Sequence, residues 1–205
     1  MFRDRKEKST KSNNSLELES IQMDAKEYQG IISSLLASKL DPLEVKSEWT
    51  AFRGLSYQYS PRVDIAVGPF SVTPGGNQTR EYNRILQTPS ASSFLRSVYD
   101  CHIENIGDQW INEIAIPELD YLIQKNQNAR CFIAFEIENS SSKKHIMGSM
   151  INAASLGRVG VGVAFNDSVL RTFVRILNYL GFLKRVEKNT YDSTNFLIIT
   201  KEQLQ

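Results

Sequence analysis

The sequence predicts a mixed α/β fold, with an α+β arrangement around a mixed sheet, for its 205 residues. Two observations lead to this fold class. Short apolar segments rich in β-branched residues alternate along the chain with longer segments whose apolar residues recur at helical spacing. Residues 131–138 and 158–165 are both strand-like, and residues 140–157 between them are helix-like. This order forms a βαβ unit, so we expect the two strands to be parallel.

The composition suits one folded domain, because 41% of the residues are hydrophobic and 23% are charged. We expect a disordered polar tail over residues 1–20 and a single domain over residues 21–205. The charged start of the chain has no apolar segment like that of a secretory signal, and no apolar run reaches membrane-spanning length. These features predict an intracellular, cytoplasmic protein without membrane contact. Cys101 and Cys131 lack CxxC spacing, which favours buried free thiols.

Two helices, a strand and a loop are predicted in the first part of the domain. Residues 18–40 place apolar side chains at helical spacing. Residues 42–54 suit a second, shorter helix, because a proline stands in its first turn and a glycine at its end. Residues 62–70 are rich in β-branched residues and end in Gly-Pro, which predicts a buried strand. Residues 71–83 predict a loop or a hairpin connection.

The second part of the domain predicts a helical insertion followed by strands and helices in alternation. The insertion carries two apolar stripes, and serines and a glycine mark the start and the end of the helix that follows the first strand. These elements are the insertion around 90–127, the strand 131–138, the helix 140–157, the strand 158–165, the helix 167–182 and the strand 195–200.

The strand 131–138 ends in two acidic residues, Glu136 and Glu138, which alternation places on one face. Two carboxylates beside apolar neighbours repel each other and lose hydration unless a cation joins them. Asp64, on the earlier strand, has only small neighbours on its own face. If the two strands are adjacent, Asp64 and Glu136 chelate one hard divalent cation, Mg²⁺ or Mn²⁺. Such an ion orients water and stabilises charge at a phosphodiester.

The order helix, strand with Asp64, strand with Glu136, helix and strand resembles the PD-(D/E)xK nuclease superfamily, whose fold is restriction-endonuclease-like. The segment "SPRVDIAVGPF" matches the first half of the motif with Asp64 at the aspartate, and "FEIEN" matches the second half with Glu136 at the acid. The resemblance covers residues 44–165. It implies a restriction-endonuclease-like core with helices on both sides of the sheet.

The resemblance also implies a magnesium-dependent endonuclease that hydrolyses DNA. Asp64 and Glu136 are then metal ligands, and Glu48, upstream in a helix, is a third. The superfamily usually has lysine at the third motif position, where this chain has Glu138 and where some restriction enzymes of the superfamily carry glutamate. Lys144, at the start of the following helix, then supplies a relocated cation, and Glu138 binds a second metal or acts as a base. Double-strand cutting requires two sites, which predicts a homodimer or a larger complex.

Other interpretations of the sequence remain open. A catalytically inactive nucleic-acid-binding or protein-assembly module with the same fold is favoured by Glu138, and a small regulatory α/β domain explains the acids as unrelated. Asp64 also suits a pair with Arg62, and Glu48 suits a solvated helix face. A winged-helix resemblance in residues 180–200 lacks the preceding helices. With only His102 and His145 in the chain, a histidine nucleophile or a multi-histidine metal site is not expected. His145 is expected to be solvated in the first turn of a helix, with a phosphate contact as the alternative.

Overall fold

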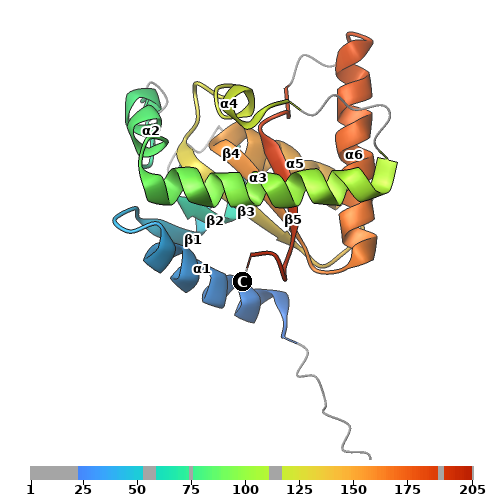
Figure 1. Cartoon of the computed structure of the whole chain (residues 1–205), viewed down its shortest axis with the longest axis horizontal. Helices are drawn as coiled ribbons and strands as arrows, with labels where there is room; N and C mark the ends of the chain where they lie inside the picture. Colours follow the sequence, from blue (N-terminus) through green and yellow to red (C-terminus); the bar gives the residue numbers. More distant parts are fainter. Residues whose placement is uncertain (1–22, 53–58, 74–75, 111–116, 189–191, 205) are drawn as a thin grey trace, which may run out of the picture.

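The structure, a computed structural model, describes residues 23–52, 59–73, 76–110, 117–188 and 192–204 (Figure 1). The predicted tail over residues 1–20 lies outside the described residues. The described chain forms a five-stranded sheet in the order β1-β2-β3-β4-β5. The strands are β1 Val45–Thr50, β2 Arg62–Val67, β3 Cys131–Glu138, β4 Gly157–Ala164 and β5 Phe196–Thr200.

The sheet is mixed, as the sequence predicts. β1, β2 and β3 form an antiparallel meander, whereas β3, β4 and β5 run parallel. The helix between β3 and β4 makes the predicted βαβ crossover. The α/β class is therefore confirmed, and the acidic end of β3 lies in the middle of the sheet rather than at an edge.

Helices cover both faces of the sheet (Figure 1). Residues of four helices, α1 to α4, join a buried cluster with Ile65, Phe135 and Val161 on one face. Residues of α5 and α6 join a second cluster with Ala66 and Ala134 on the other face. The helices are α1 Ala25–Lys39, α2 Thr79–Ile85, α3 Pro89–Trp110, α4 Leu119–Leu122, α5 Lys143–Leu156 and α6 Asp167–Arg185.

Small residues on β4 let α5 and α6 approach the sheet closely. A Cβ atom on Gly162 would stand 2.6 Å from the Phe196 ring and 2.8 Å from the Phe173 ring. A Cβ atom on Gly160 would stand 2.8 Å from the backbone nitrogen of Ala154 on α5. Both distances are shorter than van der Waals contact, so only glycine fits at these two positions.

The predicted helix over residues 42–54 is wrong, because this segment holds strand β1. Val45, Trp49 and Thr50 are residue types that suit a pleated strand, and β1 pairs along the whole of β2. The tertiary pairing outweighs the helix signals of the local proline and glycine. The predicted loop over 71–83 is also incomplete, because α2 begins at Thr79.

The edge strand β5 is held by side chains of α3. The His102 imidazole accepts a hydrogen bond at Nδ1 from the backbone N–H of Ile198, at 2.9 Å, and Asn105 donates to the carbonyl of the same residue at 3.0 Å. Burial lowers the pKa of His102 to about 3, so the ring stays neutral and keeps its acceptor nitrogen. His102 is therefore a structural residue.

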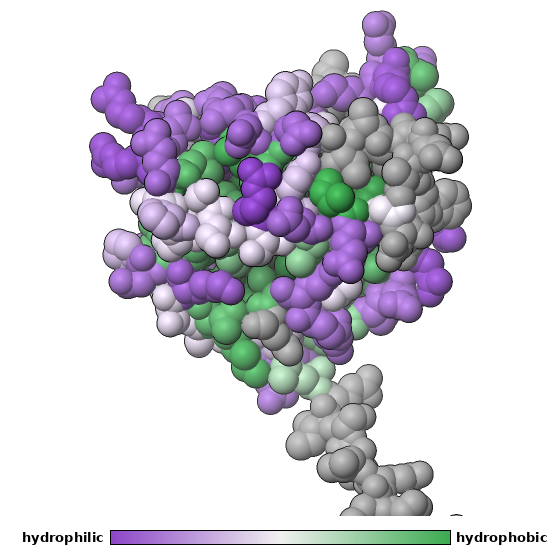
Figure 2. Space-filling model, viewed as in Figure 1, coloured by the Kyte–Doolittle hydropathy of each residue, from purple (hydrophilic) through white to green (hydrophobic). Residues whose placement is uncertain are grey.

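The face shown in Figure 2 is covered mainly by hydrophilic residues, with hydrophobic residues visible between them. Within the described residues, none of the helices combines the length and the apolar character that a membrane crossing requires. Both cysteines are free thiols; Cys131 is buried in the core and Cys101 is partly exposed.

Candidate functional site

Asp64 and Glu136 lie on the neighbouring antiparallel strands β2 and β3, each one residue beyond the pair Ile65 and Phe135 that ends the described ladder. The ladder between these strands pairs Ala66 with Ala134, and both alanines pack against the helices of the α5–α6 face. Asp64 lies two residues before Ala66 and Glu136 lies two residues after Ala134. Burial and the charge of Asp64 raise the pKa of Glu136, and the charge of His145 on α5 partly opposes the rise that burial causes in the pKa of Asp64, so both carboxylates lie near each other on the α5–α6 face.

The Glu136 carboxylate is buried and incompletely bonded. Its residue is only 6% exposed, and its Oε1 atom has no hydrogen-bond partner among the described residues. Burial, together with the neighbouring charges of Asp64 and Glu138, raises the pKa of Glu136 well above the usual range of a glutamate. A buried acceptor without a partner costs free energy, and a proton or a cation bound to this oxygen would remove that cost.

The Asp64 carboxylate lies where β2 and β3 separate. The described ladder ends at the pair Ile65 and Phe135, and beyond it the Oδ2 atom of Asp64 accepts a hydrogen bond from the backbone N–H of Ile137 at 2.7 Å. Burial raises the pKa of Asp64, and the bond from Ile137 partly opposes this rise. The bond fixes one carboxylate oxygen toward β3 and leaves Oδ1 for another ligand.

Glu138 is the third carboxylate of this face, and α5 holds it. Its Oε1 atom accepts a hydrogen bond from the Ser149 hydroxyl at 2.5 Å and lies 3.2 Å from Nε2 of His145. Burial raises the pKa of Glu138, whereas the Ser149 hydroxyl and the His145 charge oppose the rise. Unlike Glu136, Glu138 therefore has polar partners that fix its orientation.

Glu48 lies on strand β1 rather than on a helix, which corrects the predicted setting of this residue. Its φ of 52° is in the left-handed region, and the face alternation reverses there: Val45 packs with the α1–α4 cluster and Trp49 with the α5–α6 cluster. The Glu48 carboxylate accepts from Arg62 at 2.7 Å and from Gln29 at 3.2 Å. Both of its oxygens thus have protein partners.

His145 is the ionisable partner of Glu138 on α5, beside Ser149, whereas the structure describes no contact of Lys144 with any of the three carboxylates. The His145 side chain is 67% exposed, so it stands between Glu138 and solvent. Reasoning from the sequence placed His145 in solvent and overlooked Ser149. The spacing of four residues between them was the available signal, because residues at i and i+4 share one helix face.

The residues of this site fit a magnesium ion held by two carboxylates. Among the described residues, no group of three or more His, Cys, Asp or Glu side chains is arranged to hold a metal ion. Magnesium does not require such a group, because it usually binds one or two carboxylates and keeps several waters. The unpartnered Oε1 of Glu136 and the Oδ1 of Asp64 are the oxygens that would hold it.

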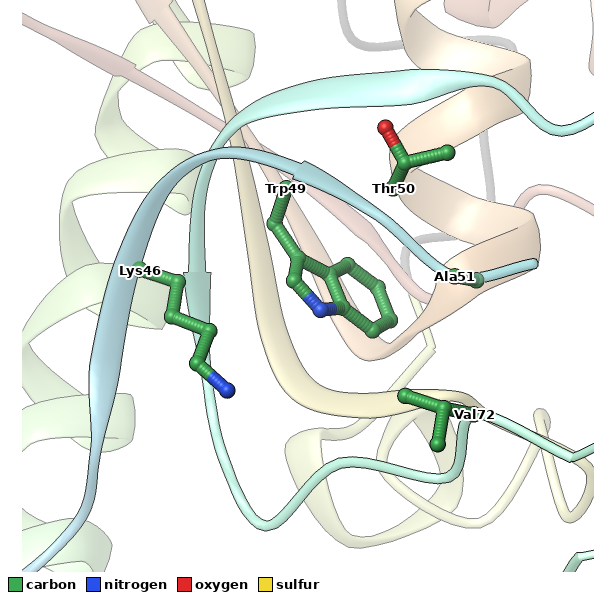
Figure 3. A pocket seen from close by; sticks show the side chains of 5 residues that line it. All are labelled: Lys46, Trp49, Thr50, Ala51 and Val72. Carbon is green, nitrogen blue, oxygen red and sulfur yellow. The ribbon is translucent and has the colours of Figure 1, made fainter. Parts of the chain in front are cut away.

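A separate pocket of about 340 Å³ lies beside edge strand β1 (Figure 3). Figure 3 shows the Trp49 indole in the middle of the lining, with Lys46 on one side of it. The Lys46 ammonium is already paired with Glu44 at 3.0 Å and stands 4.3 Å from the centroid of the Phe70 ring. The described lining contains no acid and no nucleophile with an activating base, so we place the chemistry at the carboxylates. The lining residues are Lys46, Trp49, Thr50, Ala51 and Val72.

Comparison of the chain with family models, with curated proteins and with solved structures finds no match.

The raised pKa of Glu136 predicts how stability depends on pH. The folded metal-free protein binds a proton at Glu136 more tightly than the unfolded chain, so this residue stabilises the fold at low pH. Its contribution is lost as pH rises above 4.5, the ordinary value for a glutamate, toward the pKa in the folded state. Glu136→Gln keeps the shape of the side chain without its charge, so we expect the melting temperature of this variant to exceed that of wild type at about pH 8. The increase should be about 2–4 °C for each kcal/mol gained in the free energy of unfolding.

Thermal melts of wild type and Glu136→Gln in a chelator, from about pH 4 to about pH 8, test this prediction. The difference between the two proteins should grow steadily with pH. A difference that is constant over this range would show that the charge of Glu136 does not govern it.

Proposed function

We propose that this chain is a metal-dependent nuclease that hydrolyses DNA phosphodiester bonds, with its active centre at Asp64 and Glu136. One observation carries the proposal: a buried carboxylate with an unpartnered oxygen, Glu136, lies close enough to a second, partly buried carboxylate, Asp64, for the charge of Asp64 to add to burial in raising its pKa. Structural carboxylates in a core are ordinarily paired with a cation or fully hydrogen-bonded. A site that gathers negative charge without pairing it is typical of an ion-binding centre.

Each residue of the centre has a distinct part in the proposed reaction. Asp64 and Glu136 would hold Mg²⁺, which when bound supplies an activated water and neutralises charge on the phosphate. Ile137 fixes the Asp64 carboxylate through its backbone N–H. Ser149 and His145 hold Glu138 beside the two ligands, where it accepts a proton from the attacking water.

The arrangement of elements supports the resemblance to the restriction-endonuclease-like fold. A helix precedes the antiparallel strands, Asp64 and Glu136 lie on adjacent strands, and a crossover helix leads from β3 to a parallel strand. This is the order on which the resemblance rests, with α2, α3 and α4 as an insertion between β2 and β3. Fold alone does not carry a function, so the proposal depends on the carboxylates.

A plasmid assay tests the proposed activity. Purified protein should nick or linearise supercoiled DNA in the presence of Mg²⁺ or Mn²⁺ and should leave it intact in EDTA. Failure to cleave single-stranded or double-stranded DNA at about millimolar concentrations of either metal, the range of weak protein sites, would reject the proposal.

A catalytically inactive module that binds nucleic acid or assembles with proteins is the second candidate. The observation that favours it is Glu138, which occupies the usual lysine position and is held by Ser149 and His145 rather than left open. The two candidates differ in one measurement, because the inactive module binds DNA with no metal-dependent cleavage.

His145 and Lys144, in the first turn of α5, are expected to affect cleavage unequally. His145 contacts Glu138, so His145→Gln should slow cleavage by about 10²-fold, the contribution of one positioned acid–base group. Lys144 is exposed, and Lys144→Ala should slow cleavage less. Single-turnover cleavage rates give the comparison, and the manganese-induced shift in melting temperature should be the same in both variants. A larger loss in Lys144→Ala would instead assign the cationic role to the lysine.

A further inference from the structure

The outward face of α6 carries arginines and aromatic rings in one stripe. The helix is strongly amphipathic, and its other side buries Val169, Phe173, Ile176 and Leu180 against the sheet. Outward positions recur at spacings of three and four residues, so they lie along one side of the helix. We call this set the α6 stripe; its members are Arg171, Arg175, Tyr179, Phe182 and Arg185.

Positive charge is concentrated on α5 and α6. The segments Lys143–Leu156 and Asp167–Lys188 together hold seven Lys and Arg residues and two acidic residues, a formal net charge of +5. The whole chain carries +1, so the remaining residues carry −4. The carboxylates Asp64, Glu136 and Glu138 lie on the same face of the sheet and are not in this count, so the excess of positive charge belongs to α5 and α6, and it attracts a polyanion to these helices.

The aromatic members of the α6 stripe are half exposed. Tyr179 and Phe182 are each 50% exposed, one helical turn apart and next to the arginines. A half-exposed phenyl ring gains only part of the burial free energy that a core position would give, and its exposed side provides a stacking surface for an unpaired base. Arginine supplies the complementary contact, because its guanidinium binds phosphate with two donors.

The α6 stripe begins beside the proposed active centre. Glu138 pairs with Ala164 across β3 and β4, and α6 starts three residues after Ala164. Arg171 lies in the second turn, so the stripe runs away from the carboxylate end of the sheet. Figure 1 shows α6 along one side of the molecule, with its C-terminal end extending past the strands.

We propose that the α6 stripe binds a single-stranded segment of the nucleic acid, with Arg171 and Arg185 on phosphates and the two rings against unpaired bases. Interleaved basic and aromatic side chains favour a single strand, because the bases of a duplex are stacked on each other and present no free face. The bound single strand would be the substrate of the proposed nuclease, and this role as substrate rests on the proposed function. Binding itself does not depend on cleavage.

Fluorescence anisotropy with a labelled 20-nucleotide single strand, in EDTA, tests the inference without any catalysis. We expect wild type to prefer the single strand to the duplex of the same sequence. The variant Arg171→Gln/Arg185→Gln should bind at least about 10-fold more weakly and lower the slope of log K against log salt by about 1.4, which corresponds to two lost phosphate contacts. The variant Tyr179→Ala/Phe182→Ala should bind the single strand about 10-fold more weakly or worse.

The matched control, Lys26→Gln/Arg80→Gln, removes two exposed charges from the helices of the opposite face and should change binding by less than about twofold. Equal losses in the control and in the arginine variant would overturn the inference, as would stronger binding of the duplex. A stripe variant that turns a dimer into a monomer in sedimentation and keeps its DNA affinity would also overturn it, by assigning the stripe to a protein interface. Binding of the single strand that depends on the α6 stripe, without any metal-dependent cleavage, would reject the proposed nuclease function and would support the α6 stripe as a binding surface.

Discussion

Asp64→Asn and Glu136→Gln are each expected to lower metal-dependent DNA cleavage by about 10²–10³-fold or more, the loss that follows removal of one preorganised electrostatic contact. Both substitutions keep the size of the side chain and remove the charge that would hold the ion. Initial rates of plasmid nicking in Mg²⁺ measure the effect. Glu27→Gln, which removes one acidic charge from the first turn of α1 on the opposite face, is the control and should cleave like wild type.

The two active-site variants should stay folded, because neither substitution removes packed apolar volume. Their thermal melts in EDTA therefore separate loss of the ion site from loss of the fold. Cleavage that persists at the wild-type rate in both variants would show that the activity belongs to another site or to a contaminating enzyme.

Phe173→Ala is expected to lower the free energy of unfolding by about 3–5 kcal/mol, which corresponds to a melting temperature lower by about 6–20 °C. The ring is fully buried, lies 5.9 Å from the Phe196 ring and occupies the space that Gly162 leaves open on β4. Its removal leaves a cavity between α6 and the sheet, which the backbone of β4 cannot fill.

Phe182→Ala is the matched control, since it removes the same side chain from the exposed face of the same helix. In urea denaturation, the free energy of unfolding of this variant should lie within about 0.5 kcal/mol of the wild-type value. Equal destabilisation by the two substitutions would mean that α6 does not pack through Phe173.

Reasoning from the sequence predicted the acidic strand and its surroundings well. Mostly apolar and β-branched residues define β3 and β4 over about the predicted ranges, and the βαβ rule gave their parallel pairing. Alternation along β3 also placed Glu136 and Glu138 on one face. These features depend on local pattern, so they could be predicted from one sequence.

The features that were missed depend on pairing between distant segments. β1 has little alternation of its own and becomes a strand through its ladder with β2, so its residues 45–50 were assigned to a helix. Within β1, Glu48 adopts a positive φ, which no pattern in the sequence predicts. The bond from Ile137 to Asp64 requires β2 and β3 to separate just there, and the sequence of neither strand contains that information.

A crystal of the protein soaked in manganese and measured for anomalous scattering tests the central claim most directly. The account predicts one strong peak between Oδ1 of Asp64 and Oε1 of Glu136, at about 2.0–2.2 Å from each oxygen, with waters completing an octahedron. The peak should disappear in crystals of Asp64→Asn. An empty map between these two carboxylates at saturating manganese, or a peak bound elsewhere, would contradict the claim that they form a metal centre.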